Sequence, residues 1–139
     1  MAAPTSDYLS SFEHLIGVDT YTDRNFMKKE TQMSSEYSVV LSTFADKDSA
    51  KKIAKLLVEQ RLASCVQIFP IESIYFWKEE IYDECEIMLF IKSKTTMFDK
   101  IATTIKTHHP YEVPEIVQIP ISGGLPEYLR WIDDCIDSL

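Results

Sequence analysis

Residues 107–121 hold the side chains of this chain that are best suited to metal binding. His108 and His109 are two of its three histidines, and Glu112 and Glu115 follow closely. An imidazole with nearby carboxylates suits copper or zinc. A histidine at the end of a helix has an equally good structural role, because it can hydrogen-bond a backbone carbonyl. Both interpretations of His109 stay open at this level.

Two prolines fix the backbone around these side chains. The residue before a proline is disfavoured in the helical region, so His109-Pro110 is expected to end a helix. Val113-Pro114 is expected to start an extended segment, and the apolar residues that follow up to position 121 indicate a strand. The polar block therefore lies at a corner between a helix and a strand, where domains commonly place binding groups.

No catalytic motif accompanies these residues. The sequence contains no GxSxG, Walker or HExxH motif, and its three glycines are too few for the usual phosphate-binding loop. No spacing pairs a Ser, Cys or His nucleophile with a base. We therefore expect a binding protein and no enzymatic activity.

Charge, hydropathy and cysteine usage narrow the class of protein further. With 22 acidic and 14 basic residues the net charge is −8, which argues against nucleic-acid binding. No apolar run approaches the ~18 residues of a membrane span, so no membrane partner is expected. Cys65, Cys85 and Cys135 form no CxxC pair, and an odd number cannot complete a disulfide framework. A reducing, cytoplasmic location is the simplest expectation.

Hydrophobic periodicity predicts seven elements in residues 37–139. Apolar positions alternate in strands and recur at i, i+3, i+4 and i+7 in helices. The expected elements are a strand at 37–43, a helix capped by Asp46 and ending near 61–62, strands at 64–77 and 85–93 joined by a polar turn at 78–83, a helix capped by Thr95 or Thr96, a strand at 116–121 and a helix from Pro126. This order is typical of an α+β, ferredoxin-like fold (βαββαβ plus a C-terminal helix) with a four-stranded antiparallel sheet.

Residues 1–36 differ in composition from the rest, being rich in Ser, Thr and Asp with isolated aromatics. We expect them to be an N-terminal extension that is loosely packed or disordered. In the domain that follows, the predicted helices cover one face of the sheet. The other face and the aromatic run Tyr75-Phe76-Trp77 exceed what one small domain covers, which favours self-association.

Five sequence blocks resemble the signature blocks of the CutA divalent-cation tolerance proteins, in order and in spacing. They are 62–66 (LASCV), 73–77 (SIYFW), 91–93 (IKS), 109–115 (HPYEVPE) and 128–131 (YLRW). The resemblance spans residues 38–137 and implies a ferredoxin-like homotrimer, similar in architecture to PII signalling proteins, that is linked to tolerance of divalent metal ions and of copper in particular. The chain departs from the pattern at Glu79, where the family has glycine, at Gln67, where it has asparagine, and in its first 36 residues.

The resemblance also implies candidate site residues. Cys65 matches the family's strand cysteine and is a soft ligand for Cu(I), so Cys65, His109 and Glu112 are the candidate metal ligands. A lone cysteine on an apolar strand is more often a small buried hydrophobe. A second set matches positions that the family pattern holds together and is a candidate cleft between subunits: Tyr75, Trp77, Lys92, Tyr111 and Glu115.

Two functions from different classes follow from these sets. The first is copper or divalent-metal homeostasis by a homotrimer that binds ions without catalysis. The alternative is a PII-like ligand sensor or protein-interaction scaffold, in which the cleft takes a small anion or a partner. Packing between subunits, with Trp and Tyr as anchors, is the favoured explanation of the second set. A purely structural interaction module without a physiological metal is a third alternative.

Overall fold

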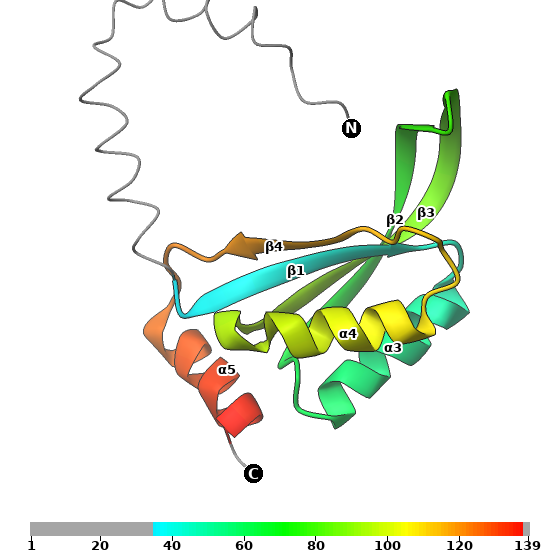
Figure 1. Cartoon of the computed structure of the whole chain (residues 1–139). Coiled ribbons are helices and arrows are strands. Elements are labelled where there is room, and N and C mark those ends of the chain that lie inside the picture. Colours follow the sequence, from blue (N-terminus) through cyan, green and yellow to red (C-terminus); the bar gives the residue numbers. More distant parts are fainter. Residues whose placement is uncertain (1–34, 138–139) are drawn as a thin grey trace, which may run out of the picture. The chain divides into compact units, whose positions relative to one another are not determined.

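The computed structural model describes residues 35–137, so the expectation for the N-terminal extension falls almost entirely outside the described residues. The elements are β1 (Tyr37–Phe44), α3 (Lys47–Glu59), β2 (Cys65–Trp77), β3 (Glu80–Lys94), η1 (Thr95–Met97), α4 (Phe98–His108), β4 (Ile116–Pro120) and α5 (Pro126–Asp137). Their order confirms the ferredoxin-like α+β fold, with one four-stranded antiparallel sheet in the order β2-β3-β1-β4. Figure 1 shows α3 and α4 together on one face of this sheet.

The main core lies between the sheet and these two helices. Asp46 caps α3 by accepting a hydrogen bond from the Ser49 backbone N–H at 2.8 Å, as its sequence position predicts. The buried helix residues are those of the predicted apolar stripes, namely Ala50, Ile53, Ala54 and Leu57 in α3 and Ile101 and Ile105 in α4. They pack on Val40, Phe44, Leu89 and Ile91 of the two central strands.

The start of α4 differs from the expectation. Met97, not a threonine, is the residue before the helix, and no side chain caps it. The Thr95 hydroxyl instead donates to the Ser35 carbonyl at 2.5 Å and lies 2.6 Å from the Ser38 hydroxyl. Thr95 therefore anchors the beginning of β1, a role that only the tertiary fold creates.

The β2–β3 hairpin extends well beyond the rest of the sheet. β1 ends at Phe44, which is opposite Ile87, so the pairs from Ile71–Glu86 to Trp77–Glu80 have no third strand from residues 35–137 beside them. We call residues 71–86 the arm, and Figure 1 shows it projecting from the sheet. An isolated two-stranded ribbon is marginally stable in water. The arm therefore needs a further surface to pack on.

The arm's turn is shorter than the sequence indicates. The polar stretch 78–83 was expected to be a loop, but β3 begins at Glu80 and the turn is Lys78-Glu79 alone. Both residues have left-handed backbones, with φ of 48° and 65°. A two-residue hairpin turn of this type normally uses Asn-Gly. The missing glycine concealed the turn from sequence inspection.

Replacing Glu79 by glycine should stabilise the protein. Glycine adopts a positive φ without the steric penalty of a Cβ, so we expect Glu79→Gly to raise the free energy of unfolding by about 0.5 kcal/mol. Glu80→Gly is the matched control, because Glu80 is extended and paired in β3. It should lower the stability, and denaturant unfolding of both variants measures the difference. A destabilised Glu79→Gly variant would contradict this account.

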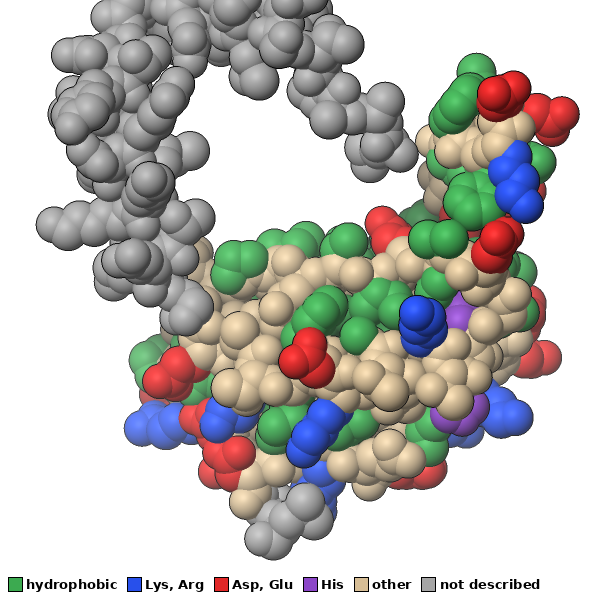
Figure 2. Space-filling view, viewed as in Figure 1, with side chains coloured by type: hydrophobic (Ala, Val, Ile, Leu, Met, Phe, Trp, Pro, Cys, Tyr) green, Lys and Arg blue, Asp and Glu red, His purple; other side chains and the backbone are tan. Residues whose placement is uncertain are grey.

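The sheet face opposite α3 and α4, which we call the open face, is apolar. Strand alternation and register place on it Leu41, Gln67, Phe69, Met88, Phe90, Val117 and Ile119. Phe69, Val117 and Ile119 are 41%, 44% and 47% exposed. Figure 2 shows hydrophobic side chains at the surface along the β4 edge and on the arm. The described chain thus leaves this face largely uncovered.

Helix α5 covers only one end of the open face. The Tyr37 hydroxyl donates to Asp133 at 2.6 Å, and Lys94 lies 3.5 Å from the Asp133 carboxylate and 3.0 Å from that of Asp137. Ile132 and Ile136 are the buried residues of the helix. These contacts fix α5 beside the start of β1 and the end of β3, away from the arm.

Candidate functional site

His109 is a buried structural residue at the corner between α4 and β4, which we define as residues 109–115. A carbonyl only accepts hydrogen bonds, so His109 Nε2–H donates to the Thr43 carbonyl at 2.6 Å. The other ring nitrogen, Nδ1, accepts from the Tyr111 backbone N–H at 3.1 Å. The ring also stacks on Phe44, with centroids 4.4 Å apart, and contacts Tyr111. Both nitrogens are therefore engaged, and the imidazole holds the corner to β1.

The three candidate metal ligands do not meet within one chain. Cys65 is paired across the sheet with Lys92, whereas the carbonyl that binds His109 belongs to Thr43, opposite Met88. Lys92 and Met88 are four positions apart on β3, a distance of roughly 13 Å along the strand. Glu112 is exposed and forms an ion pair with Lys78 at 3.3 Å. Among residues 35–137, no group of three or more His, Cys, Asp or Glu side chains has the geometry of a metal site.

Three of the candidate cleft residues gather at the base of the arm with two carboxylates that the sequence did not single out. The Tyr75 hydroxyl donates to Glu84 at 2.7 Å, and the Tyr111 hydroxyl donates to Glu86 at 3.4 Å. The Glu86 charge also acts on Glu115. The alternation of side chains along a strand could have indicated this, because it places Glu84 and Glu86 on the same face of β3. Only the pairing with β2 and the position of the corner bring them to the tyrosines.

The electrostatics of this cluster raise the pKa values of Tyr75, Tyr111 and Glu115. The hydrogen bond to Glu84 raises the pKa of Tyr75 to about 12. Partial burial, and then the charge of Glu86, raises the pKa of Tyr111 above its usual value. Loss of solvent contact raises the pKa of Glu115, and the nearby Glu86 carboxylate adds to that effect. Burial and nearby negative charge thus disfavour ionisation of Tyr75, Tyr111 and Glu115.

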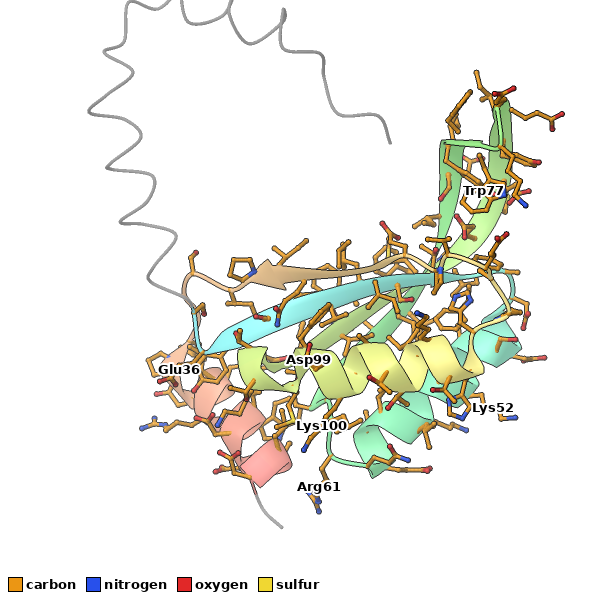
Figure 3. All side chains as sticks on the ribbon, in the orientation of Figure 1. Glu36, Lys52, Arg61, Trp77, Asp99 and Lys100 are labelled. Carbon is orange, nitrogen blue, oxygen red and sulfur yellow. The ribbon has the colours of Figure 1, made fainter. Side chains whose placement is uncertain are left out.

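Of the remaining two cleft residues, Trp77 lies two positions beyond Tyr75 on the same face of β2, whereas Lys92 lies far from both. Trp77 is at the tip of the arm (Figure 3), with the Lys78 ammonium 5.6 Å from its ring centroid. Lys92 lies near the opposite end of β3, with its Nζ 3.4 Å from the Tyr128 hydroxyl. Glu80, which pairs with Trp77, and Lys92 are twelve residues apart on one strand, a span of roughly 40 Å. One chain therefore cannot place Trp77 and Lys92 in a common cleft.

Tyr128 is a candidate residue that the sequence analysis missed. Its ring centroid lies 5.4 Å from the Lys92 ammonium, and the ring also contacts Trp131. It belongs to the 128–131 block, and its spacing along α5 was the available signal. The contact with Lys92 depends on how α5 packs on the sheet, which spacing along the chain does not specify.

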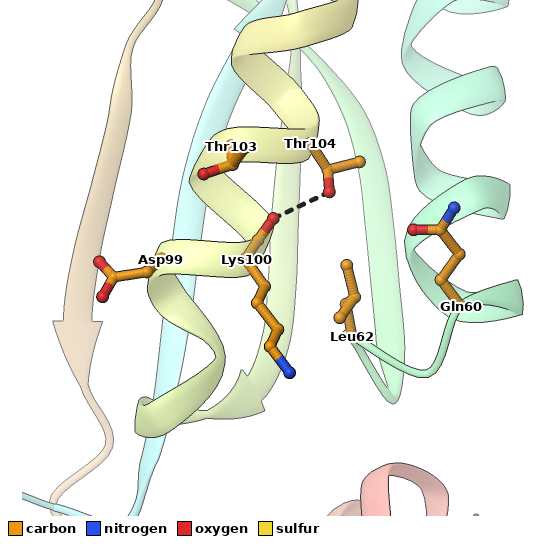
Figure 4. A pocket seen from close by; sticks show the side chains of 6 residues that line it. All are labelled: Gln60, Leu62, Asp99, Lys100, Thr103 and Thr104. Carbon is orange, nitrogen blue, oxygen red and sulfur yellow. Dashed lines mark hydrogen bonds between the residues drawn. The ribbon is translucent and has the colours of Figure 1, made fainter.

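A separate hollow lies between α3 and α4 and contains none of the predicted site residues. Its volume is about 410 Å³, and its lining includes Gln60, Leu62, Lys100 and Thr104 (Figure 4). The Thr104 hydroxyl is occupied, because it donates to the Lys100 carbonyl at 2.8 Å. The hollow opens broadly to solvent, so we assign it no function.

Comparison with known proteins identifies the family. Residues 38–135 match the family model described as CutA1 divalent ion tolerance protein. The chain belongs to the CutA1 family. It is 47% identical over 95 residues to the divalent-cation tolerance protein CutA of Thermus thermophilus. The aligned region covers 68% of this chain and 92% of that protein. A zebrafish (Danio rerio) CutA homolog is 38% identical over 105 residues, which cover 75% of this chain and 70% of that protein.

Solved CutA structures confirm the fold. CutA1 from the psychrotrophic bacterium Shewanella sp. SIB1 superposes with a TM-score of 0.71 at 44% identity, covering 73% of this chain and 96% of that one. CutA from Archaeoglobus fulgidus also superposes with a TM-score of 0.71, at 36% identity, and the match covers 72% of this chain and 98% of that one. The ferredoxin-like arrangement expected from the sequence is therefore that of the CutA1 family.

The expected cytoplasmic location is wrong as an inference for this family. The Archaeoglobus protein is described as periplasmic, and the rice and Arabidopsis thaliana relatives are described as chloroplastic. Cysteine usage reports only that disulfides are not required, so it does not select one compartment among these. As for membranes, no helix within residues 35–137 has the length and apolarity needed to span one.

Proposed function

We propose that this CutA1-family chain acts as a homotrimer in tolerance of divalent metal ions, with copper as the ion, and that it binds the ion without catalysis. The observation that supports self-association is the uncovered apolar open face beside an unsupported arm, and the number of three subunits comes from the resemblance to the CutA family. Contiguous apolar surface of this kind marks an interaction site. A second copy supplies a matching apolar surface, and closed symmetry is the common solution for soluble proteins.

Copper binding in this proposal starts from Cys65. Its side chain is half-buried on β2, on the same face as Gln67 and Phe69, and a thiolate is a soft ligand that suits Cu(I). The ligand set is incomplete in one chain, so Glu112, and His109 if its ring is released, would come from the corner of a neighbouring subunit. His109 is the weaker of these two ligands, because binding a metal would break its hydrogen bonds to Thr43 or Tyr111.

Calorimetric titration with Cu(I), Cu(II) and Zn(II) tests this assignment. We expect Cys65→Ser to weaken Cu(I) binding by about tenfold or more, because one soft ligand is lost. Cys85→Ser is the matched control, since Cys85 is an exposed thiol outside the proposed set, and it should bind as the parent does. Equal Cu(I) affinity in the parent and in Cys65→Ser would remove Cys65 from the site.

A second candidate function is supported by the separation of Trp77 from Lys92. If both belong to one cleft, the arm of one subunit must reach the Lys92 and Tyr128 pair of another. The Lys92 ammonium would then bind a small anion, as in a ligand sensor. Titration with inorganic phosphate distinguishes this function from the first. Heat of binding that is present in the parent and lost in Lys92→Met supports it, and no heat in either protein rejects it for this anion.

A further inference from the structure

The two helices that cover the sheet are basic in an otherwise acidic chain. Together α3 and α4 contain six lysines and three carboxylates, a net charge of +3. The rest of residues 35–137 contains five basic and fourteen acidic side chains, a net charge of −9. All six lysines are exposed, and Figure 3 labels Lys52 and Lys100 on the helical side of the sheet. Positive charge is thus concentrated on one layer of the domain.

Three of these lysines follow one another along α3. Lys47, Lys51 and Lys55 are spaced four residues apart, so they are neighbours on one side of the helix. Val58, seven residues after Lys51, lies on the same side and is 43% exposed. Gln60, nine residues after Lys51, lies on the opposite side, where it lines the hollow toward α4. We call Lys47, Lys51, Lys55 and Val58 the α3 ridge.

The charges of the α3 ridge work against the helix that carries them. Like charges four residues apart repel, and Lys47 is the first residue of α3, where the helix dipole is positive. The ion pairs of residues 35–137 involve Lys78, Lys94 and Arg130, so no lysine of the ridge is paired with a carboxylate there. Sequence choices that oppose their own local element are expected where a surface has a function.

A short acidic peptide fits the dimensions of the α3 ridge. Lysines four residues apart are about 6 Å apart along a helix, and alternate side chains of an extended peptide are about 6.6 Å apart. The three lysines span about 12 Å in all. A nucleic acid or a membrane surface extends further and would meet the acidic remainder of the protein. Val58 offers one apolar contact, which is too small to insert into a lipid surface.

We propose that the α3 ridge is a docking surface for a short acidic peptide segment of a partner protein. Carboxylates at alternate positions of the segment pair with the three lysines, and an apolar side chain beside them packs on Val58. The ridge belongs to the helical layer, across the sheet from the open face and Cys65 (Figure 1). The proposal therefore depends neither on the trimer nor on metal binding.

Fluorescence anisotropy of the full chain with a labelled octaglutamate peptide tests this docking surface. We expect the parent to bind the peptide at low ionic strength and to release it as salt is added, because exposed ion pairs are screened. Lys51→Gln combined with Lys55→Gln should weaken binding roughly tenfold, since two such pairs are lost. Lys51→Arg combined with Lys55→Arg keeps both charges and should bind as the parent does.

Two lysines of α4 provide the matched control. Lys100→Gln combined with Lys106→Gln removes the same charge from the same layer but outside the ridge, so binding should change by less than about twofold. The ridge variant should also be at least as stable as the parent in denaturant unfolding, because repulsion along α3 is relieved. Its weaker binding is then not a consequence of unfolding.

The results that contradict the proposal are equally specific. It is wrong if the parent does not bind the peptide, if the glutamine variant of the ridge binds as tightly as the parent, or if the α4 control loses as much affinity as the ridge variant. Tighter binding of the parent to a labelled single-stranded DNA octamer, or to vesicles of equal parts phosphatidylserine and phosphatidylcholine, would also overturn it. The ridge would then recognise phosphate groups and not carboxylates.

Discussion

Val117→Lys is expected to dissociate the proposed trimer into monomers. Val117 is 44% exposed on the open face, so a lysine there costs little within one subunit. In a trimer the same ammonium would be buried against apolar side chains without a partner, which costs several kcal/mol per subunit. Light scattering should then give a mass near 16.1 kDa in place of three times that value, about 48 kDa.

A control variant of equal exposure makes this result specific to the open face. Val58 is 43% exposed but lies on α3, on the other side of the sheet. Val58→Lys introduces the same charge and should stay trimeric. The monomeric Val117→Lys should also melt at a lower temperature, because association no longer stabilises the folded state. A monomeric parent, or a trimeric Val117→Lys, would refute the proposed assembly.

His109→Ala should cause the largest loss of subunit stability among the corner residues. The substitution removes a ring stacked on Phe44 and leaves the Thr43 carbonyl and the Tyr111 N–H without their partners. Cavity formation and two lost hydrogen bonds together cost about 2–5 kcal/mol. Denaturant unfolding at a fixed protein concentration measures this difference in free energy.

The neighbouring histidine provides the control. His108 is exposed on the last turn of α4, and its Nδ1 lies 2.8 Å from the Thr104 carbonyl of the same helix. His108→Ala should change the stability by no more than about 0.5 kcal/mol. Similar losses in the two variants would show that the buried contacts of His109 do not stabilise the corner. The sequence alone left the structural and metal-binding roles of His109 equally open.

The local elements followed from the sequence, because their causes are local. The apolar residues Ala50, Ile53, Ala54 and Leu57 share one face of a helix whatever that face packs against. Asp46 caps the same helix by binding the backbone of Ser49, three positions away. Strand alternation and the prolines at 110 and 114 act over similarly short ranges. The order of these elements then restricts the topology to a few choices, of which the ferredoxin-like fold is one.

The contacts between distant residues were decided by the tertiary structure. Cys65 and His109 are separated because of the register of β3. Cys65 is opposite Lys92, whereas Thr43, whose carbonyl binds His109, is opposite Met88. Glu86 reaches Tyr111 because the corner packs at the base of the arm, and Lys92 reaches Tyr128 because α5 packs at the far end of the same strand. Spacing along a chain determines the face and the element of each side chain. Register and packing determine which of those faces meet, and they are set by the free energy of the whole fold.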